Sequence, residues 1–172
     1  MTEPVITTAR LTLCKPQPDD LPAVAAIVAA DAVRRVLGNR AADMPDEFAR
    51  FVRNAGSWAL YGYGNFMVRE RGSAALVGIC GVFHSWRGFD GFDNVPEAGW
   101  IFAQPVWGRG YATEAAAAAL AWFDRVHGPR RIACMIDADN HASHAVAARL
   151  GFVAYGEHVF GGHVVVLLQR GG

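Results

Sequence analysis

The chain has 172 residues, of which 52% are hydrophobic, a size and composition that suit a single domain over residues 1–172 with a substantial core. Its sixteen basic and sixteen acidic residues cancel to a formal net charge of zero, which argues against a nucleic-acid partner because such a surface needs a basic stripe. No apolar run is long enough to cross a bilayer, and residues 1–10 lack the features of a signal peptide, so we expect a cytoplasmic protein without a membrane partner.

The first third of the chain predicts one strand and three helices. Apolar alternation indicates the strand, and Asp19 and Asp20 provide a cap for the first helix. The expected elements are a strand over residues 11–15, helices over residues 21–30, 31–37 and 46–55, and a loop over residues 39–45.

The remainder alternates short apolar runs with two helical segments. The expected strands cover residues 66–68, 75–83, 97–102, 131–136, 152–159 and 163–169, and the expected helices cover residues 111–126 and 140–150. Gly161 and Gly162 are typical of a hairpin turn. This order predicts an α+β, or mixed α/β layer, fold: a single mixed, mostly antiparallel sheet of about six to seven strands flanked by helices.

The most informative motif is the turn Trp107-Gly108-Arg109-Gly110-Tyr111-Ala112-Thr113-Glu114, which runs into an alanine-rich helix. Small residues before a helix expose its first backbone N–H groups, where an anion can bind. Gly110 and Ala112 would let a pyrophosphate approach the main chain closely. The alternative is that the glycines merely make a tight connection.

The cysteines and histidines predict no metal centre. Cys14, Cys80 and Cys134 lie far apart in apolar, strand-like runs, which is typical of buried reduced thiols. His141 and His144 have an i, i+3 spacing, but no carboxylate or cysteine completes a ligand set around them.

Four segments together suggest a family. They are Thr8-Ala9-Arg10-Leu11-Thr12-Leu13, Glu97-Ala98-Gly99-Trp100, Trp107 to Ala115, and Asp139-Asn140-His141-Ala142-Ser143 leading to Leu150-Gly151-Phe152. In this order they resemble the GNAT superfamily of acyl-CoA-dependent N-acetyltransferases, and most closely its ribosomal-protein-alanine (Rim-type) branch. The resemblance covers essentially the whole chain and implies the GNAT fold, with acetyl-CoA as the acyl donor.

The resemblance implies how acetyl-CoA would bind. The strand before the turn would splay from its neighbour and offer backbone groups around Ile101, Phe102 and Ala103 to the pantetheine arm. The pyrophosphate would lie on the turn formed by Trp107, Gly108, Arg109, Gly110, Tyr111, Ala112 and Thr113. The superfamily pattern has Gln or Arg where this chain has Trp107, although an aromatic residue is common there in the Rim-type branch. Arg109 either contacts a phosphate or is a solvated turn residue.

The resemblance also implies the catalytic residues. Glu97 would act as the base, through a water molecule, on the substrate ammonium. Ser143 would give a proton to the departing thiolate, directly or through water, and Asn140 would bind the pantetheine arm. The alternative is that Asn140 and Ser143 only cap a helix. Many superfamily members use a tyrosine as the acid where this chain has Ala147, which makes Ser143 the leading substitute.

The acceptor would be a primary amine, either a protein N-terminal Ala or Ser or a small molecule. Candidate pocket walls are residues 31–44, 86–94 and 155–160. In the second of these, Asp90 and Asp93 would attract a cationic amine, and Trp86, Phe89 and Phe92 would form an apolar wall; otherwise the acids are solvated and the aromatic rings cover a core edge.

Two rival functions remain open from sequence. One is a non-catalytic acyl-CoA-binding or sensing domain, and the other is a small-amine or antibiotic-detoxifying acetyltransferase. A homodimer is an expectation from the family alone.

Overall fold

Eight strands form one mixed sheet within residues 5–39 and 43–171, the parts of the chain that the computed structural model describes. The strand order is β1-β2-β3-β4-β5-β6-β8-β7. The strands are β1 Ile6–Thr7, β2 Leu11–Cys14, β3 Asn65–Glu70, β4 Leu76–Ser85, β5 Val95–Phe102, β6 Ile132–Asp137, β7 Val153–Phe160 and β8 His163–Arg170. The expected α+β fold is confirmed, and the strand beyond the predicted number is the two-residue β1, which lengthens one edge by pairing with β2.

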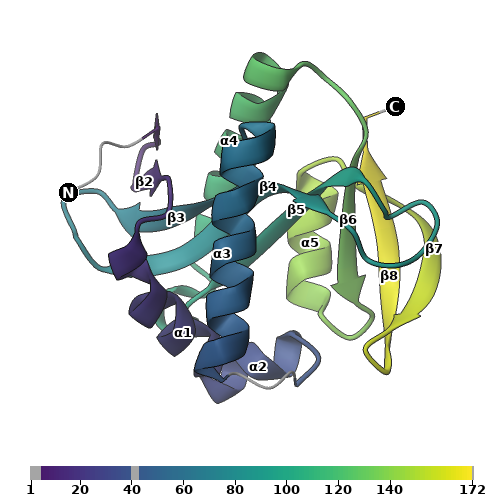
Figure 1. Cartoon of the computed structure of the whole chain (residues 1–172), viewed down its shortest axis with the longest axis horizontal. Coiled ribbons are helices and arrows are strands. Elements are labelled where there is room, and N and C mark those ends of the chain that lie inside the picture. Colours follow the sequence, from purple (N-terminus) through teal and green to yellow (C-terminus); the bar gives the residue numbers. More distant parts are fainter. Residues whose placement is uncertain (1–4, 40–42, 172) are drawn as a thin grey trace.

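Five α-helices and two short 3-10 helices accompany the sheet in the described residues (Figure 1). They are η1 Pro18–Asp20, α1 Leu21–Ala29, α2 Asp31–Val36, α3 Met44–Tyr61, η2 Gln104–Val106, α4 Tyr111–His127 and α5 His141–Arg149. Four of the five predicted α-helices match to within a residue or two. Of the predicted loop over residues 39–45, residues 40–42 lie outside the described residues.

Helix α3 is longer than the predicted segment over residues 46–55. Asp43 caps it by accepting a hydrogen bond from the Asp46 backbone, and Pro45 fits the first turn because a proline there loses no helical hydrogen bond. The helix then runs on to Gly62, which adopts a left-handed conformation with φ 78° and ends it.

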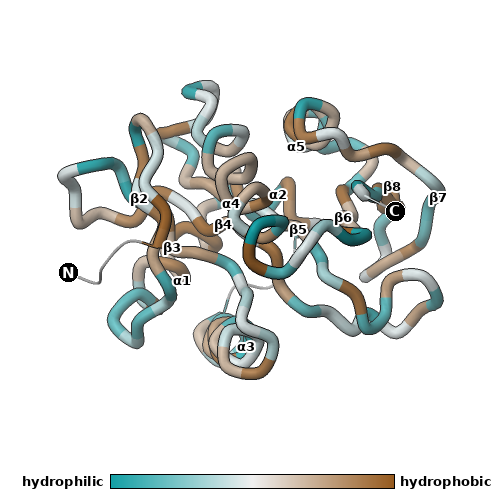
Figure 2. Tube along the Cα trace, turned by 90° about the horizontal axis from the view of Figure 1, so that it is seen from above, coloured by the Kyte–Doolittle hydropathy of each residue, from teal (hydrophilic) through white to brown (hydrophobic). Residues whose placement is uncertain are grey.

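The helices divide between the two faces of the sheet. Figure 2 shows α3 on one side and α4 and α5 on the other. The alanine-rich face of α4 is buried against the sheet, with Ala115, Ala116 and Ala119 beside Leu11 and Phe66. Because alanine side chains are small, α4 can approach the strands closely, and this fixes where its N-terminal turn lies.

The sheet opens in its middle. Strands β4 and β5 pair along their full length, whereas the parallel strands β5 and β6 share one register pair in the described structure, Glu97 opposite Ala133. Beyond that pair the two strands diverge. The gap between them is where the candidate site lies.

Candidate active site

A cavity of about 880 Å³ occupies the gap between β5 and β6. One wall is formed by β5 from Glu97 to Ile101, and the opposite wall by β6 from Cys134 to Asp137. Asn140 and Ser143 of α5 also line it, as do residues of α3 and of the segment that follows β4. The structure thus brings Glu97 to the same cavity as Asn140 and Ser143, which lie more than 40 residues later in the sequence.

The backbone of β5 presents alternate residues to this gap. Ala103 donates its N–H to Val77 of β4 at 2.9 Å, and the antiparallel alternation then turns Ile101 to β4 as well. Trp100 and Phe102 therefore direct their N–H and C=O groups toward the gap. The Phe102 carbonyl accepts a hydrogen bond from the Trp107 indole at 2.8 Å.

This alternation refines the residues expected to contact a pantetheine arm. Of the predicted three, Ile101 turns its backbone groups to β4, and Ala103 donates its N–H to Val77 and accepts from the Val106 N–H at 3.1 Å. Trp100, which was not among them, shares the outward orientation of Phe102. The sequence predicts that alternate residues of a strand turn their backbone groups to the same side. Which residues face the gap, however, depends on the register of the β4–β5 pair.

The turn before α4 is an open cradle of N–H groups. Gly108 and Gly110 have φ of 74° and 77°, in the left-handed region that suits glycine. No side chain caps α4, and its first backbone bond runs from Glu114 to Gly110. The N–H groups of residues 111–113 consequently have no helical acceptor, and they carry the positive end of the helix dipole.

A carboxylate of α4 ties this turn to the start of the chain. Glu114 accepts hydrogen bonds from the Thr8 hydroxyl at 2.6 Å, the Arg10 N–H at 3.0 Å and the Arg10 Nε at 2.7 Å. Arg10 also donates to the carbonyl of Arg109 at 2.7 Å. Burial opposes ionisation of Glu114, but the bonds from Thr8 and Arg10 outweigh it and hold its pKa below the usual range. Glu114 is therefore a structural anchor.

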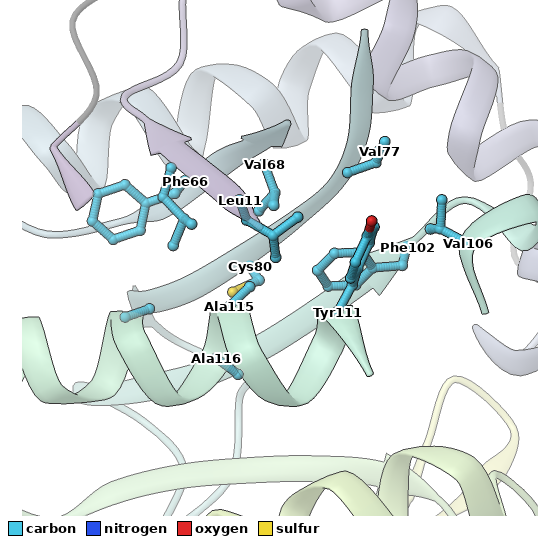
Figure 3. Packing of buried hydrophobic residues seen from close by; sticks show 12 residues of the cluster. Leu11, Phe66, Val68, Val77, Cys80, Phe102, Val106, Tyr111, Ala115 and Ala116 are labelled. Atoms are coloured by element: carbon cyan, nitrogen blue, oxygen red, sulfur yellow. The ribbon is translucent and has the colours of Figure 1, made fainter. Parts of the chain in front are cut away.

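Arg109 is ion-paired in the structure. It donates to Glu70 at 2.7 Å, and its guanidinium lies 4.5 Å from the ring centroid of Tyr111. The Tyr111 hydroxyl donates to the same Glu70 oxygen at 2.7 Å, which lowers the pKa of Glu70 and raises that of Tyr111. The ring of Tyr111 is buried beside Phe102 (Figure 3). Arg109 therefore helps to fix the turn on β3.

Glu97 forms a buried ion pair that the sequence did not indicate. The carboxylate is 4% exposed, and its two oxygens accept from Arg87 Nε at 2.8 Å and from the second guanidinium nitrogen at 2.6 Å. A bidentate pair of this kind fixes the orientation of the carboxylate. Arg87 follows the end of β4. In the sequence it is a single cation in the aromatic loop over residues 86–94, and nothing else there indicated that it pairs with Glu97.

Ser143 is oriented by two groups. Its Oγ accepts a hydrogen bond from the Trp100 indole at 3.2 Å, and its backbone N–H donates to the Asn140 side chain at 3.1 Å. Because an indole N–H only donates, the hydroxyl proton of Ser143 is left to point elsewhere. Asn140 does cap α5, and its amide also donates to the Val36 carbonyl at 3.4 Å.

The aromatic loop over residues 86–94 differs from the expected amine-binding wall. Asp93 accepts from the backbone N–H groups of Arg87 and Gly88, so it shapes the loop. Phe92 is fully buried and Phe89 stacks on His158. Only Trp86 and Arg87 of this loop line the cavity.

Other reactive side chains lie outside this chemistry. Cys14, Cys80 and Cys134 are buried and form no disulfide among the described residues, and burial raises the pKa of Cys80 to about 12. The described residues contain no group of three or more His, Cys, Asp or Glu placed to hold a metal ion. Nor does any helix in the described ranges have the length and apolarity to cross a bilayer.

Comparison with known proteins places these features in a family. Residues 10–153 match the family model described as an acetyltransferase (GNAT) domain. Uncharacterized protein YkkB of Bacillus subtilis is 32% identical over 93 residues, which are 53% of this chain and 51% of YkkB. The match therefore spans about half the length of that curated relative.

Two solved structures share the fold across nearly the whole chain. A chain from Bordetella pertussis assigned to the GNAT acetyltransferases has 33% identity and a TM-score of 0.87, with 98% of this chain and 99% of that chain covered. RimL, a ribosomal L7/L12 α-N-protein acetyltransferase solved with coenzyme A, has 17% identity and a TM-score of 0.76, with 98% of each chain covered. Since the family model spans most of the sequence and the splayed sheet matches these folds, the chain belongs to the GNAT family of acetyltransferases.

Proposed function

We propose that this chain transfers the acetyl group of acetyl-CoA directly to a primary amine, with both substrates bound in the β5–β6 cavity. The observation that carries the proposal is the continuity of two binding features. The last residue of β5 whose backbone faces the gap is Phe102, and the Trp107 indole donates to its carbonyl, which places the open turn of α4 beside the end of β5. A cosubstrate with a diphosphate at one end and an amide-bearing arm at the other can place the diphosphate on the turn and the arm along the outward backbone of β5.

The diphosphate is assigned to the turn of Trp107, Gly108, Arg109, Gly110, Tyr111, Ala112 and Thr113. Backbone N–H groups supply the contact, because the Arg109 guanidinium is paired with Glu70 and the Trp107 indole with Phe102. The pantetheine arm is assigned to the outward backbone of Trp100 and Phe102, with the side-chain amide of Asn140 across the gap.

The proposed chemistry uses two side chains of the cavity. Glu97, held in place by Arg87, would accept the amine proton through a water molecule, which leaves a neutral amine to attack the thioester. Ser143 would supply the proton that the departing thiolate takes up, since its hydroxyl accepts from Trp100 and keeps its own proton available. The buried Ala147 offers no acid at the position where many relatives have tyrosine.

The acceptor is proposed to be either a peptide N-terminus or a small-molecule amine. The peptide option is supported by the structural likeness to RimL, whose substrate is a ribosomal protein. The cavity itself, at about 880 Å³, has room for an amine of either kind beside the pantetheine arm.

The test is a thiol-release assay with purified protein. Acetyl-CoA is incubated with N-terminal peptides, polyamines, amino acids and aminoglycosides, and products are identified by mass spectrometry. We expect thiol release coupled to N-acetylation of at least one class. Tight CoA binding with no release for any acceptor would contradict the proposal and favour a binding or sensing domain.

A further inference from the structure

The end of the cavity nearest α3 is lined by three arginines. Arg50 and Arg53 of α3 and Arg87 of the following loop all contribute to its wall. Arg53 and Arg50 lie one and two turns before Ser57 on the same face of α3, and the Ser57 hydroxyl accepts from the His84 backbone at 3.0 Å. That bond fixes this face of α3 against the end of β4, just before Arg87.

Two of these arginines have carboxylate partners. Arg87 forms the bidentate pair with Glu97. Arg50 lies 3.6 Å from Glu47, and its Nε is buried without a hydrogen-bond partner among the described residues. The Arg50 guanidinium is therefore incompletely satisfied, although a carboxylate is near.

Arg53 has no carboxylate partner within the described part of the chain. Burial, and then the guanidinium groups of Arg50 and Arg87, lower its pKa from the ordinary value, and the carboxylates of Asp46 and Glu47 offset only part of this. An arginine nevertheless keeps its charge at any physiological pH. Arg53 is an exposed side chain, and the wall of the cavity near α3 thus carries its permanent positive charge together with those of Arg50 and Arg87.

From this arrangement we propose that the acceptor carries an anionic group, a carboxylate or a phosphate, which Arg53 binds with help from Arg50 while the acceptor amine lies toward Glu97. The proposal rests on the proposed function and specifies its substrate class. A guanidinium offers a planar set of donors that suits either oxyanion. Binding an anion would also relieve the repulsion among Arg50, Arg53 and Arg87.

The experiment compares acceptors in matched pairs. One arm uses ω-amino acids of increasing length, each with its neutral carboxamide, and the other uses aminoalkyl phosphates, each with its amino alcohol. The kcat/KM for thiol release is measured for wild type, Arg53→Gln, Arg53→Lys and a control, Arg125→Gln. Arg125 is an exposed cation of α4 outside the cavity, so the control removes the same charge elsewhere.

In wild type, we expect at least one anionic acceptor to exceed its neutral partner by about tenfold or more, as for the loss of one charge-assisted hydrogen bond. The preference should fall toward parity in Arg53→Gln and persist in Arg53→Lys and Arg125→Gln. The better arm identifies carboxylate or phosphate. Equal rates for charged and neutral partners, or a preference unchanged in Arg53→Gln, would overturn the inference while leaving amine acetylation intact.

A binding measurement keeps the inference testable without turnover. With CoA present, the affinities of N-acetylated ω-amino acids and of their carboxamides are compared by calorimetry. Tighter binding of the acids that is lost in Arg53→Gln supports the anion site even if no acceptor releases thiol. Equal affinities for the acids and the amides would contradict it.

Discussion

The hydroxyl of Ser143 is held so that its oxygen accepts and its proton remains free. The Trp100 indole donates to Oγ at 3.2 Å, and the Asn140 cap fixes the backbone of the same residue. Capping and proton donation are therefore compatible roles for neighbouring atoms. The hydrogen bond from the Ser143 N–H to the Asn140 side chain begins α5, and the same start of the helix places Ser143 on the cavity wall.

Removing that hydroxyl should affect chemistry more than binding. We expect Ser143→Ala to lower kcat by about tenfold or more, since general acid catalysis contributes at least that much, while the Kd for CoA stays near wild type. Steady-state kinetics with calorimetry measures both. Trp100→Phe, which removes the indole donor but leaves the Ser143 hydroxyl in place, should have a smaller effect on kcat. A wild-type kcat in Ser143→Ala would exclude the hydroxyl as the donor.

Replacing the carboxylate of Glu97 should likewise reduce turnover. Glu97→Gln keeps the shape of the side chain but cannot take up the amine proton, so kcat should fall by about tenfold or more with CoA affinity retained. The partly exposed Arg87 can turn to water when its partner loses charge. Unchanged turnover with a verified acceptor would remove Glu97 from the mechanism.

At the scale of elements, the turn before α4 depends on two left-handed glycines. An added Cβ at Gly108 would meet no atom within 4 Å, so the space beside it is open. The same is true of Gly151, which has φ 81° and ends α5 away from the turn. A substitution at either glycine strains the backbone, but only one at Gly108 also places a side-chain atom in the turn before α4. Comparing the two positions therefore distinguishes backbone strain from blocked ligand binding.

We expect Gly108→Ala and Gly151→Ala to destabilise the fold similarly, by about 1 kcal/mol each, because alanine is strained in the left-handed region. Only Gly108→Ala should also weaken CoA binding, by several-fold, because its Cβ would lie where the diphosphate is assigned. Thermal unfolding and calorimetry test the two effects. Equal CoA affinity in both variants would argue against the turn as the diphosphate site.

The anchor of α4 should make stability depend on acid pH. The pKa of Glu114 is lowered in the folded state, so its contribution is present above the ordinary glutamate value of about 4.3 and is lost as pH falls through the folded value. The unfolding free energy from urea titrations should therefore drop below about pH 4.3. Glu114→Gln should flatten part of that drop, and an identical pH profile would contradict the anchor.

Local sequence signals predicted most elements well. Asn140 was a credible cap because its partner Ser143 lies only three residues away. The start of α3 was missed because Pro45 was assigned to a loop, although proline suits the first turn of a helix. The error arose because proline is common both in loops and in the first turn of helices.

For the whole molecule, the contacts that complete the site were beyond sequence reasoning. Thr8 reaches Glu114 across 106 residues, and Arg109 reaches Glu70 across 39. Such pairs depend on which strands are neighbours, and periodicity does not fix that order. The motifs therefore predicted the turn before α4 and three residues that line the cavity, Glu97, Asn140 and Ser143, whereas the Arg87–Glu97 pair and the cations of α3 required the fold.

The most direct test of the account is a crystal structure of the protein with CoA. We expect the diphosphate on the N–H groups of the turn between Gly108 and Thr113, and the pantetheine arm in the β5–β6 gap beside Trp100 and Phe102. Its thiol should lie near Ser143. CoA bound elsewhere, or a gap between β5 and β6 that stays empty at saturating CoA, would contradict the account.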